Sequence, residues 1–229
     1  MSGLIVLIVV ILCFGSIFIT AGDVIMFGFL LVIAIAVAIA LLCRNCALNK
    51  TVSKVPEDQL HVLNLDKGGI FRLTGVGNNS EEINLKVIAK HLYRQGDYYW
   101  YELECDKGGG EKIWVEVEDD DETEVSIVLE KLTLADIGMT SNRLTLIDDE
   151  ETGVVSYRGL SYKYTDSDEA VFYRFCDDAK AEKLYYWDFE NGKYSVSVER
   201  WGNRDYDVFY SQKMLPSQIT VYLNKEKGV

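Results

Sequence analysis

The most regular pattern along the chain is the run of hydrophobic positions at its start. Residues 4–20 are apolar or small, and so are residues 24–43, with only Ala21, Gly22 and Asp23 between the two runs. About 20 apolar residues in a helix span the hydrocarbon core of a bilayer, and about 17 are just enough. The pattern therefore predicts a transmembrane helical hairpin over residues 1–45, followed by a linker over residues 46–59.

A cleaved signal peptide and a single re-entrant segment are the alternatives to this hairpin. A signal peptide is disfavoured because no basic residue precedes the first run, and because the bulky Ile19 would occupy the cleavage site. A re-entrant segment is disfavoured because it would place Asp23 at the bilayer centre, where an ionised group is costly. The hairpin remains the favoured interpretation.

Basic residues set the expected orientation of the hairpin. Arg44, Lys50 and Lys54 follow the second run, whereas the short loop at Asp23 has no basic residue. Positive charge is retained on the cytoplasmic side of membranes. We therefore expect both termini and the remaining 46–229 segment in the cytoplasm, with the lipid bilayer as one partner of the chain.

The rest of the chain alternates between apolar and polar residues. This period of two, typical of strands with one buried face, recurs in several short segments, which include 99–105, 113–117, 125–129 and 194–199. The dipeptide Asn191-Gly192 indicates a two-residue hairpin turn. Only residues 134–138 and the segment near Leu215 look like short helical turns. The pattern predicts an all-β, antiparallel domain, and the thiols of Cys105 and Cys176 are expected to be buried in its strands.

Similar short motifs recur in the two halves of this domain. Tyr173 lies 72 positions after Tyr101, Tyr185 lies 71 positions after Trp114, and each member of a pair sits in a similar strand–turn–strand context. The repeat predicts two related β units over residues 60–140 and 141–229, which form a sandwich or a partly open barrel. Chance similarity between tyrosine-rich, acidic segments is the alternative.

The first of these motifs resembles a bacterial domain of unknown function, number 4178 in that naming. The resemblance rests on residues 99–103, a glycine-rich turn and residues 112–116, where Trp114 is followed by valine instead of the leucine typical of the family. The second half looks like a divergent copy, so the resemblance covers most of residues 60–225. It implies a bacterial protein with a role at the cytoplasmic membrane, because members are found near genes for membrane-stress proteins and for enzymes that resemble polyamine biosynthesis. It implies no catalytic residues.

Charge and composition exclude some functions and leave others open. The chain carries 36 acidic and 23 basic residues, for a formal net charge of −13. Nucleic acid is therefore not expected as a partner, since phosphate binding needs a basic surface. Cys43 and Cys46 form a C-x-x-C pair whose alternatives are ordinary thiols, acylation, redox chemistry or metal binding. We expect no catalytic residue, no cofactor and no metal site.

One local feature is a candidate contact for a cation or a basic partner. Seven of nine consecutive residues are acidic, and they are Glu116, Glu118, Asp119, Asp120, Asp121, Glu122 and Glu124. This run follows a predicted strand, so a solvated turn that protects a strand edge is the simpler interpretation. Trp114 is expected to point away from the aliphatic face of Ile113, Val115 and Val117.

These observations favour a non-enzymatic, membrane-anchored β-domain that binds or scaffolds a membrane or cytoplasmic protein. The alternative is a sensor of a small ligand, a cation or a polyamine, which would use the acidic turn and exposed aromatic residues. A flat aromatic patch in the structure would favour scaffolding, and an enclosed cavity would favour sensing. The oligomeric state is not readable from the sequence.

The predicted topology leads to a labelling experiment in intact cells. A cysteine introduced at Asp23 should react with a membrane-impermeant thiol reagent, because the loop should lie outside the membrane. A cysteine at Lys227 should react only after the membrane is opened. Reaction at Lys227 in intact cells would show that the orientation is inverted.

Overall fold

A computed structural model describes residues 55–119, 122–202 and 205–225. The predicted hairpin, residues 1–45, lies outside these residues, as does most of the predicted linker. Among the described residues, no helix is long and apolar enough to cross a membrane. All the described residues belong to one compact unit, residues 53–229.

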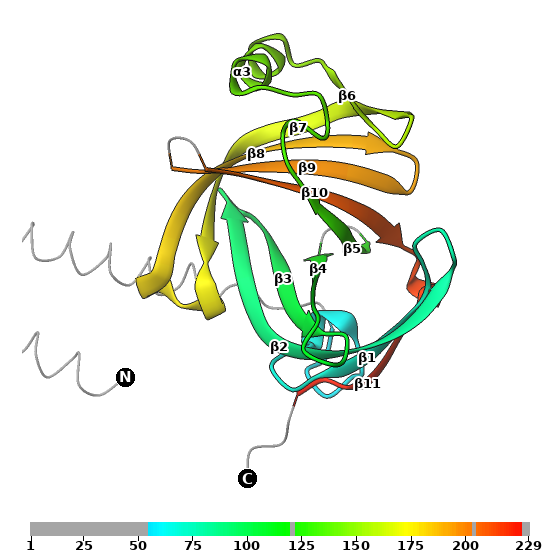
Figure 1. Cartoon of the computed structure of the whole chain (residues 1–229). Helices are drawn as coiled ribbons and strands as arrows, with labels where there is room; N and C mark the ends of the chain where they lie inside the picture. Colours follow the sequence, from blue (N-terminus) through cyan, green and yellow to red (C-terminus); the bar gives the residue numbers. More distant parts are fainter. Residues whose placement is uncertain (1–54, 120–121, 203–204, 226–229) are drawn as a thin grey trace, which may run out of the picture. The chain divides into compact units, whose positions relative to one another are not determined.

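The described chain is built from two successive five-stranded meanders and one final strand (Figure 1). Every pair of neighbouring strands is antiparallel, which confirms the predicted all-β, antiparallel class. The first meander contains β1 (Ile70–Val76), β2 (Glu81–Gln95), β3 (Tyr98–Asp106), β4 (Lys112–Asp119) and β5 (Thr123–Leu132). The second contains β6 (Val154–Tyr157), β7 (Leu160–Tyr173), β8 (Ala181–Asn191), β9 (Tyr194–Trp201) and β10 (Asp205–Met214), and β11 (Ile219–Leu223) follows.

Two seams join the meanders into a closed ring. β5 pairs with β10 along most of its length, and Leu92–Arg94 of the long strand β2 pair with Val171–Tyr173 of the long strand β7. The ring therefore runs through β2, β3, β4, β5, β10, β9, β8 and β7, and returns to β2. Each seam joins the strands that hold the same place in the two meanders. This is the arrangement of an isologous, twofold interface, here formed within one chain.

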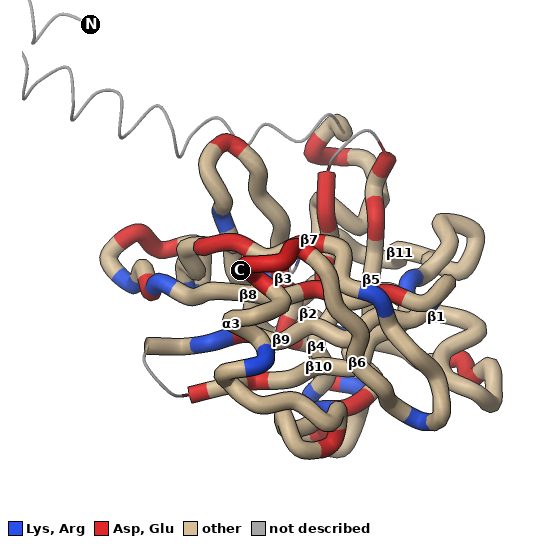
Figure 2. The backbone as a smooth tube through the Cα atoms, turned by 90° about the horizontal axis from the view of Figure 1, so that it is seen from above, with Lys and Arg blue, Asp and Glu red and all other residues tan. Residues whose placement is uncertain are grey.

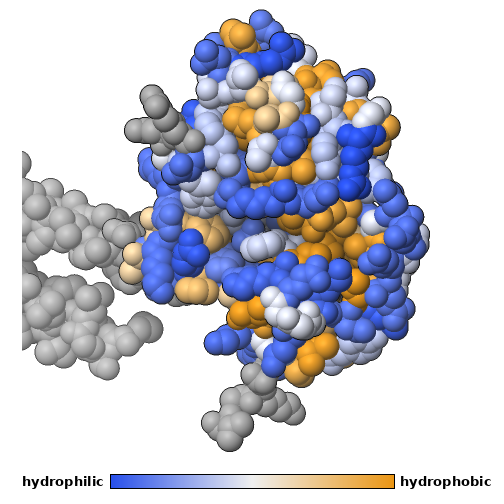
Figure 3. Space-filling view, viewed as in Figure 1, coloured by the Kyte–Doolittle hydropathy of each residue, from blue (hydrophilic) through white to orange (hydrophobic). Residues whose placement is uncertain are grey.

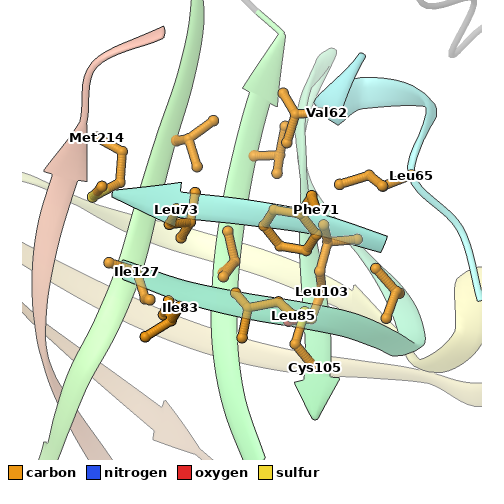
Figure 4. Packing of buried hydrophobic residues seen from close by; sticks show 14 of the residues in the cluster. Val62, Leu65, Phe71, Leu73, Ile83, Leu85, Leu103, Cys105, Ile127 and Met214 are labelled. Atoms are coloured by element: carbon orange, nitrogen blue, oxygen red, sulfur yellow. Dashed lines mark hydrogen bonds between the residues drawn. The ribbon is translucent and has the colours of Figure 1, made fainter. Parts of the chain in front are cut away.

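The outer face of each half of the ring is apolar and covered. In the first half, β1, the beginning of β2 and β11 cross over the outer face of β3, β4 and β5 (Figure 4). Phe71 and Leu73 of β1 meet Leu103, Val115 and Ile127 there, and all five side chains are fully buried. The short 3-10 helix η1 (Val62–Asn64) closes the end of this core.

The second half is covered by a helix that the sequence pattern did not predict. α3 (Ser141–Glu150) is preceded by its N-cap residue, Thr140. The hydroxyl oxygen of Thr140 accepts a hydrogen bond from the backbone N–H of Arg143. Leu144 and Ile147 are its buried side chains, and they join a core that includes Trp187 and Phe189 of β8. Only two of its ten residues are buried. Two apolar positions are too few to produce a recognisable helical period in the sequence.

Two local predictions are corrected by the structure. The β8–β9 hairpin is confirmed, but Asn191 pairs with Tyr194, so Gly192 and Lys193 form its turn. Gly192 alone has a positive φ of 60°, as the first central position of a type II′ turn requires. Cys105 is buried as expected, whereas Cys176 is exposed because it lies in the 3-10 turn η2 (Arg174–Cys176) after β7.

The two motifs that look alike in the sequence do not lie on strands that hold the same place in the two meanders. Tyr101 lies on β3, the third strand of its meander, whereas Tyr173 ends β7, the second strand of the other. Trp114 on β4 and Tyr185 on β8 differ by one strand in the same way. All these strands alternate apolar and polar residues, so a motif match shifted by one strand looks as good as the topological match.

The outer core makes a quantitative prediction about stability. Leu103→Ala should lower the free energy of unfolding by about 2–5 kcal/mol, because Leu103 is fully buried and its loss leaves a cavity. Leu146→Ala is the matched control, since Leu146 lies on α3 with 56% of its surface exposed and should change stability by about 0.5 kcal/mol or less. Chemical denaturation measures both values. Equal effects of the two substitutions would contradict the placement of the core outside the ring.

Candidate functional site: the polar lumen of the ring

The inside of the ring is a polar cavity, which we call the lumen. All eight ring strands contribute side chains to each of its two ends, which have cavity volumes of about 520 and 430 Å³. Glu199 of β9 lines both ends. In Figure 3, hydrophilic side chains border the hollow between the two halves.

The larger end of the lumen is strongly acidic, and we call it the acidic end. Seven carboxylate residues from β4, β5, β7, β8 and β9 line it: Glu116, Glu118, Glu124, Asp166, Asp188, Glu190 and Glu199. Lys213 of β10 is the single basic residue that lines this end. Its ammonium lies 3.1 Å from a carboxylate oxygen of Glu124 and 3.1 Å from one of Glu190. Figure 2 shows the acidic positions along these strands as well as on the surface loops.

The smaller end carries charges of both signs, with five carboxylate and three basic residues besides His91, and we call it the mixed end. Each of its three basic residues other than His91 already has an acidic partner there. Lys112 lies 2.5 Å from Glu104, Lys131 lies 2.7 Å from Asp207, and Arg174 lies 3.8 Å from Glu182. A cationic ligand is therefore attracted to the acidic end more strongly than to the mixed end.

Four carboxylates deep in the lumen lack such a partner, and we call them the inner cluster: Glu102, Glu116, Asp188 and Glu199. Glu102 on β3 stands directly opposite Glu116 on β4 in the strand register. None of the ion pairs within the described residues includes any of the four. Carboxylates opposite each other on one sheet face repel unless a cation or a proton separates them.

This environment raises the pKa of each member of the inner cluster. Burial among the ring strands is the main cause, and neighbouring carboxylates add to it. The pKa of Glu102 rises to about 8, that of Asp188 to about 7 and that of Glu199 to about 8. The pKa of Glu116 also lies well above its usual range.

Aromatic rings line the lumen beside these carboxylates. Trp100 stacks on Tyr93 with ring centroids 5.1 Å apart, and it meets the edge of Tyr186 at 6.0 Å. In the strand register, Trp100 stands opposite Glu118 in one half, and Tyr186 stands opposite Glu199 in the other. Each half of the ring therefore presents an aromatic–carboxylate pair to the lumen at the acidic end. Ammonium groups are attracted to both members of such a pair.

The structure separates the acidic run that the sequence singled out. Glu116 and Glu118 lie on β4 and Glu124 lies on β5, and all three line the lumen and do not form a solvated turn. Asp119 ends β4, Glu122 is exposed in the turn, and Asp120 and Asp121 lie outside the described residues. The simple turn interpretation is therefore wrong for the three lumen residues.

Other lumen residues occupy positions that the sequence pattern does not distinguish from solvent-facing ones. Glu102 and Glu199 occupy the polar positions of alternating strands, where a lumen and the protein surface produce the same pattern. Trp114 does point away from the aliphatic face, as predicted, and it lines the mixed end. Among the described residues, no three His, Cys, Asp or Glu side chains converge closely enough to hold a metal ion.

His91 of β2 is a buried residue of the mixed end. Its Nδ1 accepts the backbone N–H of Phe175 at 3.0 Å, and its Nε2 lies 3.8 Å from a carboxylate oxygen of Glu104. Burial lowers the pKa of His91, so its imidazole is neutral at neutral pH. These contacts fix the η2 turn at the rim of the lumen.

The residues that form the ring are also the residues that match a known protein family. The family model described as "Domain of unknown function (DUF4178)" matches residues 81–216. The chain belongs to this family. The DUF4178 match begins at the first residue of β2 and ends two residues after β10, so it covers the whole ring and leaves out β1 and β11. No curated protein and no solved structure matches the chain.

The raised pKa values of the inner cluster predict how stability depends on pH. Between about pH 4.5 and pH 8 the folded protein binds more protons than the unfolded chain, so this cluster favours folding at low pH and the benefit is lost as pH rises. The double variant Glu102→Gln/Glu116→Gln should flatten this dependence and melt at a higher temperature than the wild type at pH 8. Thermal melting at pH 5 and pH 8 measures the effect.

Glu150→Gln is the control for this experiment, because Glu150 is an exposed residue of α3 outside the lumen. It should leave the wild-type dependence on pH unchanged. A double variant that melts with the same pH dependence as Glu150→Gln would show that the inner cluster titrates like surface carboxylates.

Proposed function

We propose that the DUF4178 ring is a binding module for a small organic cation, an amine such as a polyamine, which it holds in the acidic end of the lumen. The observation that supports this most strongly is the inner cluster, whose carboxylates have no basic partner. Three of its four members line the acidic end together with Trp100 and Tyr186. A buried carboxylate without a partner is costly, and a ligand's ammonium group would remove that cost. Binding, and not catalysis, is the role that we propose.

Lys213 shows how the lumen would hold an ammonium group. Its Nζ lies between Glu124 of one half and Glu190 of the other, at 3.1 Å from each. A ligand ammonium would occupy a similar position deeper in the lumen, between Glu116 and Glu199, with the face of Trp100 nearby. The same contacts that stabilise the lysine side chain would then stabilise the ligand.

An organic cation fits this site better than a metal ion. Metal ions need several ligand atoms at short, fixed distances, and no such group of side chains is present among residues 55–119, 122–202 and 205–225. The carboxylates instead are spread along a cavity of about 520 Å³ with aromatic walls. Distributed charge and aromatic surface suit an elongated amine.

The scaffolding hypothesis drawn from the sequence is less well supported. Trp100, Trp114 and Trp201 line the lumen and do not form a flat docking patch. We retain the predicted membrane hairpin as part of the proposal. The ring would then sense an amine at the cytoplasmic face of the bacterial membrane and report it to a partner.

Calorimetry of the full-length chain with spermidine tests the proposal. Wild-type protein should bind, and the affinity should fall as salt rises, because the attraction is electrostatic. The double variant Glu116→Gln/Glu199→Gln should bind at least about tenfold more weakly, which corresponds to about 1.4 kcal/mol. Glutamine keeps the shape of the side chain and removes only its charge.

The acidic turn provides the matched control. Replacement of Asp119, Asp120 and Asp121 by Asn and of Glu122 by Gln removes more charge than the lumen variant but leaves the lumen carboxylates in place. It should change the affinity only slightly. Strong loss of binding in the turn variant together with full binding in the lumen variant would place the cation site at the turn and refute the proposal.

A further inference from the structure

The inner cluster has a consequence for how a ligand would enter the lumen, and this consequence rests on the proposed function. Glu102 and Glu116 stand directly opposite each other on neighbouring strands, and Glu199 reaches both ends of the lumen from the facing half. Three or more carboxylates in such a space cannot all be ionised without a large repulsion. When no cation is present, a proton is the simplest group that separates them.

The charged groups around the cluster do not remove this repulsion. On the acidic side lie the carboxylates of Glu118, Asp166 and Glu190, and the one ammonium there, that of Lys213, is held by Glu124 and Glu190. On the other side lie Glu104, Asp207 and Glu182, which are paired with Lys112, Lys131 and Arg174 in turn. His91 and Tyr93 also face the mixed end, and both are neutral at pH 7.

Neighbouring residues in the same lumen provide an internal comparison. Glu124 and Glu190 share the Lys213 ammonium, and neither is a member of the inner cluster. Trp201 Nε1 donates a hydrogen bond to Glu199 at 3.1 Å, but a neutral donor does not cancel a charge. Glu124 and Glu190 therefore have a cation within the chain, whereas the inner cluster does not.

We propose that the inner cluster is a proton–cation exchange site, which holds at least one shared proton in the empty lumen and releases it to solvent when a cationic ligand enters. The ligand's ammonium group takes the place of the proton between the carboxylates, so the charge in the lumen balances before and after exchange. The shared proton belongs to the cluster and not to one residue. The affinity for the ligand would then rise with pH, and local acidification would expel the ligand.

Two measurements on the full-length chain test the exchange. The first is calorimetry with spermidine at pH 7 in buffers with different enthalpies of ionisation, which reports the number of protons released. The second is titration of the ligand-free protein between pH 5.5 and pH 8.5, with the double variant Glu102→Gln/Glu116→Gln as the reference. We expect release of about one proton per ligand, an affinity that rises by up to about tenfold per pH unit between pH 6 and pH 7.5, and excess proton uptake by the wild type.

Glu190→Gln is the matched variant inside the lumen. It removes the same charge as one inner substitution, but from a carboxylate that already has the Lys213 ammonium. It should weaken binding through the loss of charge and still release the wild-type number of protons. Glu102→Gln/Glu116→Gln should release fewer protons, and equal proton release by these two variants would overturn the proposal.

The outcomes distinguish this inference from the proposed function. Spermidine binding with a heat that does not depend on the buffer would support the binding function and overturn proton exchange. Absence of spermidine binding would refute the proposed function. In that case a ligand-free titration without excess proton uptake would overturn the inference as well, whereas excess uptake would support the shared proton.

Discussion

Closure of the ring between β2 and β7 is the constraint on which the rest of the structure depends. Three residue pairs around Tyr93 and Phe172 join two strands that are distant in the sequence. Without this seam the two meanders would meet only along β5 and β10, and their polar faces would open to solvent. With it, the same faces enclose a lumen in which carboxylates are partly removed from water.

The two apolar cores on the outer faces follow from that closure. A ring with polar residues inside must bury its apolar residues on the outside, and an uncovered outer face would be a large hydrophobic surface. Each half therefore brings its own cover, β1 and β11 in one case and α3 with β6 in the other. The contrast with most small barrels, whose interiors are filled by apolar side chains, explains why a ligand-sized space exists here at all.

Much of the fold could be predicted from the alternation of residues, because period two is a local property. Residues such as Val115 and Val117, with Glu116 and Glu118 between them, identify strands without further information. The alternation does not reveal whether a polar face meets bulk water or a lumen, since both favour the same residues. That difference depends on the pairing of Tyr93 with Phe172, which is a contact distant in sequence. The site was therefore only partly predictable: the acidic run in the sequence contains Glu116, Glu118 and Glu124, but nothing in the sequence distinguishes Glu102 and Glu199 from surface residues.

The location of both halves in a single chain has its own consequence for the lumen. In a true dimer of identical subunits, any change on one wall would be repeated on the other. Here the two walls carry different residues, Trp100 opposite Glu118 on one and Tyr186 opposite Glu199 on the other. Because both walls belong to one chain, each wall can change without altering its counterpart. The two walls can therefore recognise different parts of an asymmetric ligand.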